Sequence, residues 1–314
     1  MVYESRAYNP NISSIKEAWT EHFSNSEQID VDVLIAGGAG ESISKHIVDL
    51  AERRKDCVAF VSPPATLTTS GTMTDPAHDG TFSGYSGPAN VISWRNNTLN
   101  VNSSYAVIDS GWKMIYDSYN DMNRWIPLNS DVAGLTVETE AGSGAWMSPA
   151  GFNRGRIRNV VQLSMNPSKR HRDELYSNGI NPVVSFPGEG TILFGDKTAQ
   201  RRATALDRIN VRRLMIHIEK AISTQAKFNL FEFNDDFTRR SFVQSVVPFL
   251  RGIEARRGIT DFMVVCDDTN NTPDIIDKNA FVADIFIKPA KSINFIQLNF
   301  SVLRSDAAFS ESVV

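Results

Sequence analysis

The sequence is poor in cysteine and has no long apolar run. Cys57 and Cys266 are the only cysteines among 314 residues, and they lie far apart in apolar, strand-like segments. Such cysteines are typically buried thiols, so we expect no disulfide, no cysteine-based metal site and a reducing compartment. No apolar run approaches the roughly 20 residues of a membrane helix, and the opening MVYESRAYNP does not resemble a secretory leader. We therefore expect a soluble protein, without membrane insertion and without export through a cleaved leader.

The sequence also has no strong excess of positive or negative charge. The chain has 32 basic and 36 acidic residues, which argues against nucleic acid or an anionic membrane as its main partner. The two halves differ in sign, because residues 1–195 carry 15 basic and 21 acidic groups, and residues 196–314 carry 17 and 15. A change of sign along the chain favours two domains.

No catalytic constellation is recognisable in the sequence. The histidines are scattered, and none has the two-histidine spacing of a metal site. There is no Gly-x-Ser-x-Gly elbow, and neither cysteine has an adjacent histidine. We therefore expect no catalytic residue, no metal and no cofactor, which means a protein that is not an enzyme.

One turn keeps an enzyme alternative open. A strand at residues 29–36, the turn GGAGES at Gly37–Ser42, a helix to about Arg54 and a strand at residues 57–61 form a predicted βαβ unit. Glycine turns at helix N-termini can bind phosphate. Glu41 stands where a phosphate-binding loop has lysine, and Ile43 stands where a dinucleotide fingerprint has its third glycine. A plain tight turn is therefore favoured over a nucleotide site.

Residues 65–100 are rich in Thr, Ser, Gly and Asn. This composition predicts a long surface loop with little regular structure, or one that carries a short helix. Such a loop also supports a third hypothesis, a carbohydrate-binding or adhesin-type protein that uses residues 65–100.

The carboxyl-terminal half has the strongest helical pattern. Residues 209–226 place apolar side chains on one stripe and predict an amphipathic helix. Residues 229–233, NLFEF, alternate and predict a strand. Residues 236–257 predict a second helix, which begins at an aspartate cap and contains Pro248.

Residues 281–303 alternate between apolar and polar side chains, which predicts two strands separated by Pro289–Ser292. The phase changes by one residue within the second strand, which is typical of a bulge. This pattern fits the last strand of the chain's own sheet, or a strand that pairs with a neighbour's sheet. The residues that would make this inter-subunit strand are Ile293, Phe295, Ile296, Leu298, Phe300 and Val302.

Several stretches, taken together, resemble the tail sheath protein of contractile-tailed bacteriophages of the myovirus type. They occur in the order of that family and span most of residues 115–300. They are IYDSYNDMNRWIPLNSDVAGL (115–135), MSPAGFNRGRI (147–157), NGINPVVSFPGEGTILFGDKTA (178–199), INVRRLMIHIEKAI (209–222), FEFND (231–235) and IDKNAFVADIFIKPAKSINFIQLNF (276–300).

The resemblance implies a structural subunit of the phage tail, assembled in the host cytoplasm. It would polymerise with neighbouring subunits as stacked six-fold rings around the tail tube, with the baseplate and tail terminator proteins as further partners. Contraction would drive the tube through the host envelope. The resemblance also implies that strands are exchanged between subunits. Subunits of this family are usually longer, so we expect this chain to be a carboxyl-terminal portion that folds alone but polymerises poorly.

Arginines are the candidate docking residues. Arg154 and Arg156 lie in a loop, where they are either solvated or reach carboxylates on another chain. Arg239, Arg240, Arg256 and Arg257 lie on the second helix and are candidates for docking on the tube or on a neighbour, or form a solvated face.

The fold class we expect is mixed α/β in two domains, each with a mixed sheet and flanking helices. Residues 1–195 form the first domain, with the loop at 65–100. Residues 196–314 form the second, with helices 209–226 and 236–257 and assembly strands 281–303.

Overall fold

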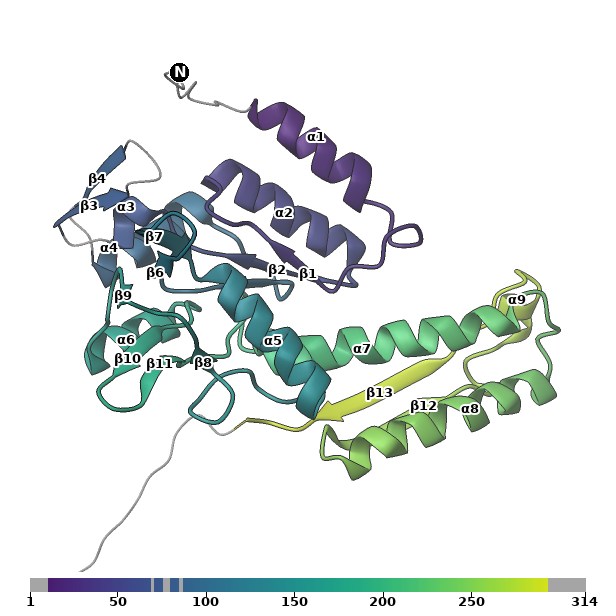
Figure 1. The fold of residues 1–314 in the computed structure, drawn as a ribbon. Coiled ribbons are helices and arrows are strands. Elements are labelled where there is room, and N and C mark those ends of the chain that lie inside the picture. Colours follow the sequence, from purple (N-terminus) through teal and green to yellow (C-terminus); the bar gives the residue numbers. More distant parts are fainter. Residues whose placement is uncertain (1–10, 69–70, 76–79, 85–86, 293–314) are drawn as a thin grey trace, which may run out of the picture.

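The computed structural model describes residues 11–68, 71–75, 80–84 and 87–292. Figure 1 shows a larger part, built around a parallel sheet, and an elongated part that extends to one side of it. We call these parts the body, residues 11–208, and the lobe, residues 209–292. In the described part of the chain, no helix is long and apolar enough to cross a membrane.

Three short parallel strands form the centre of the body. They are β1 (Val33–Ile35), β2 (Val58–Val61) and β5 (Ala106–Ile108), with β2 in the middle. Both faces of this sheet are covered, which is why its strands are almost entirely apolar. The βαβ unit predicted from the sequence is confirmed.

Successive residues of β2 face opposite layers. Ala59 and Val61 pack with α2 (Glu41–Arg54), and α1 (Ile12–Phe23) lies outside α2. Val58 and Phe60 pack with α5 (Asn129–Ser143) on the other side. The body is therefore a three-layer arrangement of helix, sheet and helix.

The structure corrects the prediction for residues 65–100, because the range contains short helices, as one alternative allowed, and also two strands and a π-helix. The described residues of this range form elements that the polar composition concealed, because few apolar side chains anchor them. Val91, Trp94 and Leu99 are buried in the core beside α2. The elements are α3 (Ala65–Thr68), β3 (Gly71–Asp75), β4 (Gly80–Gly84), α4 (Pro88–Ser93) and a π-helix, η1 (Trp94–Leu99).

Small antiparallel sheets complete the body. One has the order β7-β6-β9 and the other has the order β10-β11-β8, with α6 (Lys169–Ser177) beside them. The mixed α/β class is confirmed, but the mixing is between sheets, because none of the sheets built from the described strands combines the two directions. The strands are β6 (Trp112–Asp117), β7 (Met122–Pro127), β8 (Arg156–Ile157), β9 (Gln162–Leu163), β10 (Val183–Phe186) and β11 (Gly190–Leu193).

Two long helices and a two-stranded sheet form the lobe. The first helix, α7 (Ile209–Ala226), has the predicted bounds. The second, α8 (Asp236–Ala255), contains Pro248 as predicted and ends two residues early, because Arg257 takes a left-handed φ of 66°. The two strands are β12 (Ile259–Val265) and β13 (Asp284–Pro289). The shorter elements are η3 (Lys227–Asn229) and α9 (Pro273–Ile276) in the lobe, and η2 (Ala205–Asp207) just before α7.

Two strand predictions in the lobe need correction. Residues 229–233 are the end of η3 and a turn, and Phe231 has a φ of 71°, which no strand allows. An alternating pattern of five residues is consistent with a strand, but it does not show that a partner strand lies beside it. In the last predicted strand pair, the first strand begins at Asp284 rather than at residue 281. The second, with Ile293, Phe295, Ile296, Leu298, Phe300 and Val302, lies outside the described residues.

Candidate assembly surfaces

The sheet of the lobe has one covered face and one open face. β12 and β13 are antiparallel, and Val264 opposite Ile285 faces the core made by α7 and α8. Met263 opposite Phe286 faces outward, and both side chains are 55% exposed. A sheet of this kind alternates between dry and wet positions, as the sequence of residues 284–288 predicted.

The edges of this sheet are the feature most relevant to assembly. Among the strands that the structure describes, β12 and β13 pair only with each other. Each strand therefore has one edge whose backbone donors and acceptors have no described strand beside them. Such an edge is a template for pairing with a further strand.

A buried carboxylate holds the chain where it leaves β13. Asp196 is 4% exposed, and its Oδ2 accepts hydrogen bonds from the hydroxyls of Ser292 at 2.9 Å and Ser148 at 3.0 Å. Its Oδ1 accepts from Tyr176 and from Arg208, each at 3.0 Å. Asp196 thus joins the body, the start of α7 and the chain after β13, and it anchors the described chain at Ser292.

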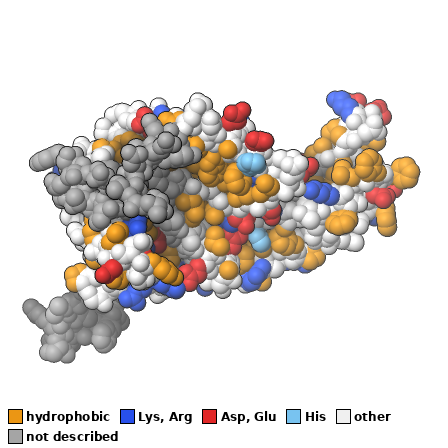
Figure 2. All heavy atoms as spheres, turned by 45° about the horizontal axis from the view of Figure 1, so that its top comes forward, with side chains coloured by type: hydrophobic (Ala, Val, Ile, Leu, Met, Phe, Trp, Pro, Cys, Tyr) orange, Lys and Arg blue, Asp and Glu red, His pale blue; other side chains and the backbone are white. Residues whose placement is uncertain are grey.

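The far end of the lobe presents a cluster of exposed aromatic side chains. We call it the tip, and its apolar members are Phe228, Leu230, Phe231, Phe233 and Phe237. Figure 2 shows hydrophobic side chains at that end of the molecule, to the right. Asn234 ties the turn to the rest of the lobe, because its side-chain amide donates to the Ala280 carbonyl at 2.8 Å.

Acidic groups accompany the aromatic groups of the tip. Residues 227–240 and 267–278, which meet there, carry seven acidic and four basic side chains. The Thr238 backbone N–H donates to Asp235 and lowers the pKa of that carboxyl, and the Thr269 hydroxyl does the same for the pKa of Asp267. Asp235 and Asp267 therefore carry a negative charge at neutral pH.

A second aromatic cluster lies on the body, at the β10–β11 hairpin. We call it the triad: Phe152, Phe186 and Phe194, whose ring centroids are 5.4 to 6.2 Å apart. Phe152 and Phe194 are exposed, and the Arg172 guanidinium lies 5.3 Å from the centroids of Phe186 and Phe194. The sequence analysis missed this cluster because its members come from separate segments.

Arg239 does not serve as an exposed docking residue. Its side chain is 6% exposed, and it donates to Asp268 at 2.6 Å and to Asn234 at 3.1 Å. Arg240 is exposed and pairs with Asp236 one helical turn away. The period of the helix places these neighbours on different faces, so one is structural and the other remains a docking candidate.

The other candidate arginines are scattered. Arg256 is exposed and lies 4.7 Å from the ring of Trp146, and Arg257 is an exposed residue of the turn after α8. Arg156 is exposed on β8, and half-buried Arg154 donates to the Ser148 carbonyl at 2.8 Å. The structure therefore does not bring the six arginines together into one surface.

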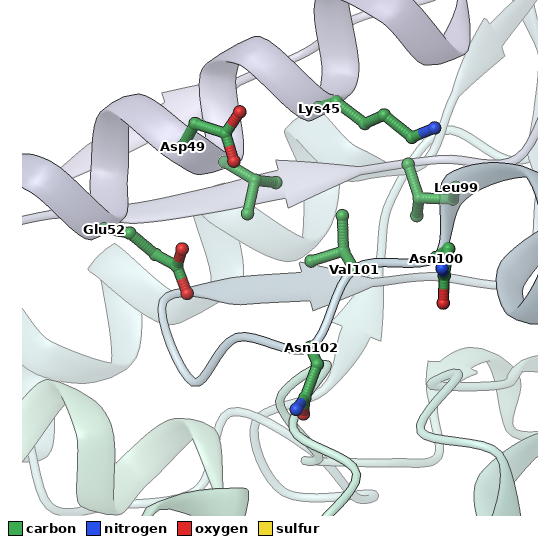
Figure 3. A pocket seen from close by; sticks show the side chains of 8 residues that line it. Lys45, Asp49, Glu52, Leu99, Asn100, Val101 and Asn102 are labelled. Atoms are coloured by element: carbon green, nitrogen blue, oxygen red, sulfur yellow. The ribbon is translucent and has the colours of Figure 1, made fainter.

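The turn that suggested a nucleotide site is held to the body at Gly37, while Gly38, Gly40 and Glu41 are exposed. Gly37 has a left-handed φ of 58°, and its carbonyl accepts a hydrogen bond from the Asn129 side chain at 2.8 Å. A shallow hollow beside α2, drawn in Figure 3, is lined by Asp49 and Glu52 with a single lysine, Lys45. Two carboxylates would repel phosphate, and the hollow lies along the side of the helix rather than at its glycine turn.

A buried acid follows β5, but it is enclosed. Burial raises the pKa of Asp109 to about 8, although Ser62 donates to it at 2.6 Å and the Gly111 N–H donates at 2.9 Å. Asp109 is 1% exposed, and it does not line the hollow beside α2. Within the described ranges, no group of three or more His, Cys, Asp or Glu side chains could hold a metal ion.

Two family models match nearly the whole chain. The model for the phage tail sheath protein central domain matches residues 14–199, and the model for the phage tail sheath C-terminal domain matches residues 202–302.

Curated relatives agree with the family models. The tail sheath protein of Vibrio phage KVP40 is 45% identical, over 99% of this chain and 48% of that protein. The tail sheath protein of Enterobacteria phage T4 is 43% identical, over 95% of this chain and 45% of that protein. The chain thus spans about half the length of the curated relatives it matches.

A solved structure has the same fold at much lower identity. It is the sheath complex of an extracellular contractile injection system, named PVC, in its contracted state. The TM-score is 0.68 at 20% identity, covering 87% of this chain and 71% of that one.

Proposed function

The chain belongs to the phage tail sheath family, and from that premise we propose that it is a structural subunit of a contractile tail sheath and not an enzyme. It would polymerise with its neighbours as stacked six-fold rings around the tail tube, between the baseplate and the tail terminator. It would act in the virion after assembly in the host cytoplasm, without a cofactor. Its domains would be residues 1–195 and 196–314. Support comes from the two family models and from relatives named as tail sheath proteins.

One observation carries the proposed assembly: the lobe has a two-stranded sheet with an edge free of described strands on each side. We propose that a strand from Ile293 to Val302 of a neighbouring subunit pairs at one of these edges. Its apolar positions alternate from Ile296 to Val302, as those of β13 do. The hydrogen bond from Ser292 to Asp196 anchors the chain immediately before this segment in its own subunit.

Backbone pairing suits a lattice that must contract without breaking. Strand addition uses main-chain hydrogen bonds, which hold while rigid domains rotate or slide around them. The energy for contraction would be stored in a metastable extended lattice, and more interface would form in the contracted one. No nucleotide hydrolysis is required by this scheme.

A labelled peptide of residues 290–314 tests strand exchange directly. We expect it to bind the purified chain saturably in a fluorescence anisotropy titration, and unlabelled peptide should compete. A peptide with Leu298→Pro should bind about tenfold more weakly or worse, because proline removes a central backbone donor.

A variant of the full chain provides a second measurement of strand exchange. The full chain carrying Leu298→Pro has a weaker strand of its own to compete, so it should bind the unmodified peptide more tightly than the parent does. If neither chain binds the peptide, or if both peptides bind equally, strand exchange by this segment is wrong.

The two alternatives have separate measurements. A calorimetric titration with ATP that gave saturable binding, lost on substitution of Gly40, would restore the nucleotide-enzyme hypothesis. A glycan-array signal that depended on residues 65–100 would restore the carbohydrate-binding hypothesis. We expect neither, because Glu41 opposes phosphate and because Val91, Trp94 and Leu99 of this range are buried in the core.

A further inference from the structure

The tip and the triad lie at opposite ends of the molecule. In Figure 1 the turn after α7 is at the right-hand end, and the β10–β11 hairpin is at the left-hand end of the body. The two clusters of one chain therefore cannot touch each other. Exposed aromatic clusters of this kind on a soluble protein typically mark interaction sites.

We propose that the tip of one copy docks on the triad of a second copy of this chain. This contact is separate from strand exchange. It deepens the proposed function and rests on it in one respect, because it assumes that copies of the chain assemble with one another.

Charge complementarity identifies the second copy as the occupant. The tip carries seven acidic and four basic groups within residues 227–240 and 267–278. Residues 152–158, 169–174 and 186–194, which surround the triad, carry six basic and three acidic groups. The imbalances are opposite in sign and equal in size. Complementary potentials of this kind orient partners and reject like-charged surfaces.

The chemistry of the two clusters also matches. Phe231 and Phe233 are rigid aromatic anchors, the type of residue that dominates interface energetics, and both project from a turn rather than into the lobe. The triad offers exposed rings on which such anchors can stack, and Arg172 is placed beside them. Carboxylates of the tip, such as Glu232, would then face the arginines around the triad.

A contact between two different patches is heterologous. Each copy retains a free tip and a free triad after pairing once, so the contact can repeat. Repetition closes a ring or extends a helix, according to the rotation between successive copies. Both outcomes are compatible with a sheath.

Cross-linking between two preparations tests the contact. One preparation carries Glu232→Cys in the tip, and the other carries Asn153→Cys beside Phe152; both positions are exposed. The native Cys57 and Cys266 are buried, so they should not react. One preparation is isotopically labelled, and a short bismaleimide is added to the mixture. We expect links between residues 232 and 153 of different copies, and few between two copies of either position.

A double variant measures the contribution of the anchors. Phe231→Ser with Phe233→Ser should lower the cross-link yield about tenfold, because two interface anchors are lost. Tyr119→Ser is the matched control, because Tyr119 is an aromatic residue, 97% exposed, in the turn between β6 and β7 and belongs to neither cluster. It should leave the yield unchanged. Equal thermal melting of all variants would show that folding is not the cause.

The outcomes separate this inference from the proposed function. If the 232–153 link does not form while the peptide of residues 290–314 still binds, the docking contact is wrong and strand exchange stands. If the link forms and the peptide does not bind, the reverse holds. Dominant 232–232 links, or a tip that links only to an added tail tube protein, would also overturn the contact.

Discussion

The body and the lobe both pack helices on a sheet, but they differ in how completely the sheet is covered. In the body, α2 and α5 cover the two faces of β1, β2 and β5, and every residue of β2 is buried. In the lobe, α7 and α8 cover one face of β12 and β13, and the other face and the edges are open.

This difference separates folding from assembly. A sheet covered on both faces has satisfied its hydrophobic surface inside one chain. A sheet covered on one face, with open edges, keeps surface and backbone groups that another strand can satisfy. The body therefore leaves little of its central sheet for another chain to cover, and the lobe is where we expect the chain to meet its neighbours.

The largest expected effect comes from a substitution in the covered sheet of the body. Phe60→Ala in β2 should lower the free energy of unfolding by about 3–5 kcal/mol, because it empties a fully enclosed site. Phe286→Ala on the open face of β13 should cost no more than about 1 kcal/mol, the size of one cross-strand pair. Urea denaturation of both variants measures the two values. Similar losses at both positions would mean that the outer face of the lobe is covered within the chain.

The next effect concerns the pH dependence of the body. Asp109 has its pKa raised to about 8 by burial, so the folded state holds this proton at pH values where the unfolded chain has released it. Its contribution to stability is present below the ordinary aspartate pKa, falls as the pH rises and is lost above about pH 8. The steepest fall should approach about 1.4 kcal/mol per pH unit.

Asp109→Asn isolates this effect, because the amide stays neutral at every pH. The difference in unfolding free energy between parent and variant should shrink as the pH rises from about 4 to 8, and the variant should be relatively better in alkali. Asp121→Asn, in the exposed turn before β7, is the control for the loss of one carboxylate. A difference that does not change with pH would show that Asp109 is charged in the folded protein.

The sequence predicted the long, periodic elements well. The 18 residues of α7 carry an apolar stripe through five turns, and such a pattern identifies a helix and its approximate length. The parallel strands of the body are also recognisable as short apolar runs. These are local signals, because each depends on residues that are neighbours in the chain.

Features that depend on residues far apart in the sequence could not be predicted from such local patterns. The five residues 229–233 alternate as a strand does, but whether a partner strand lies beside them is a property of the fold. The triad joins Phe152, Phe186 and Phe194 only after the hairpin has formed. Arg239 and Arg240 look alike in the sequence, and only the packing of α8 shows that one is buried.

The smallest expected effect tests the distinction between buried Arg239 and exposed Arg240. It also tests whether the lobe has buried polar contacts that stabilise its own fold. Arg239→Ala should cost about 2 kcal/mol, because two partly buried hydrogen bonds are lost, one of them to a carboxylate. The loss stays moderate because Asp268, its partner, is exposed and regains water. Arg240→Ala should cost less than about 0.5 kcal/mol, since its pair with Asp236 is exposed at both ends. If chemical denaturation gave the opposite order, Arg239 would be free to dock on a partner, and the lobe would depend on its neighbours even for its fold.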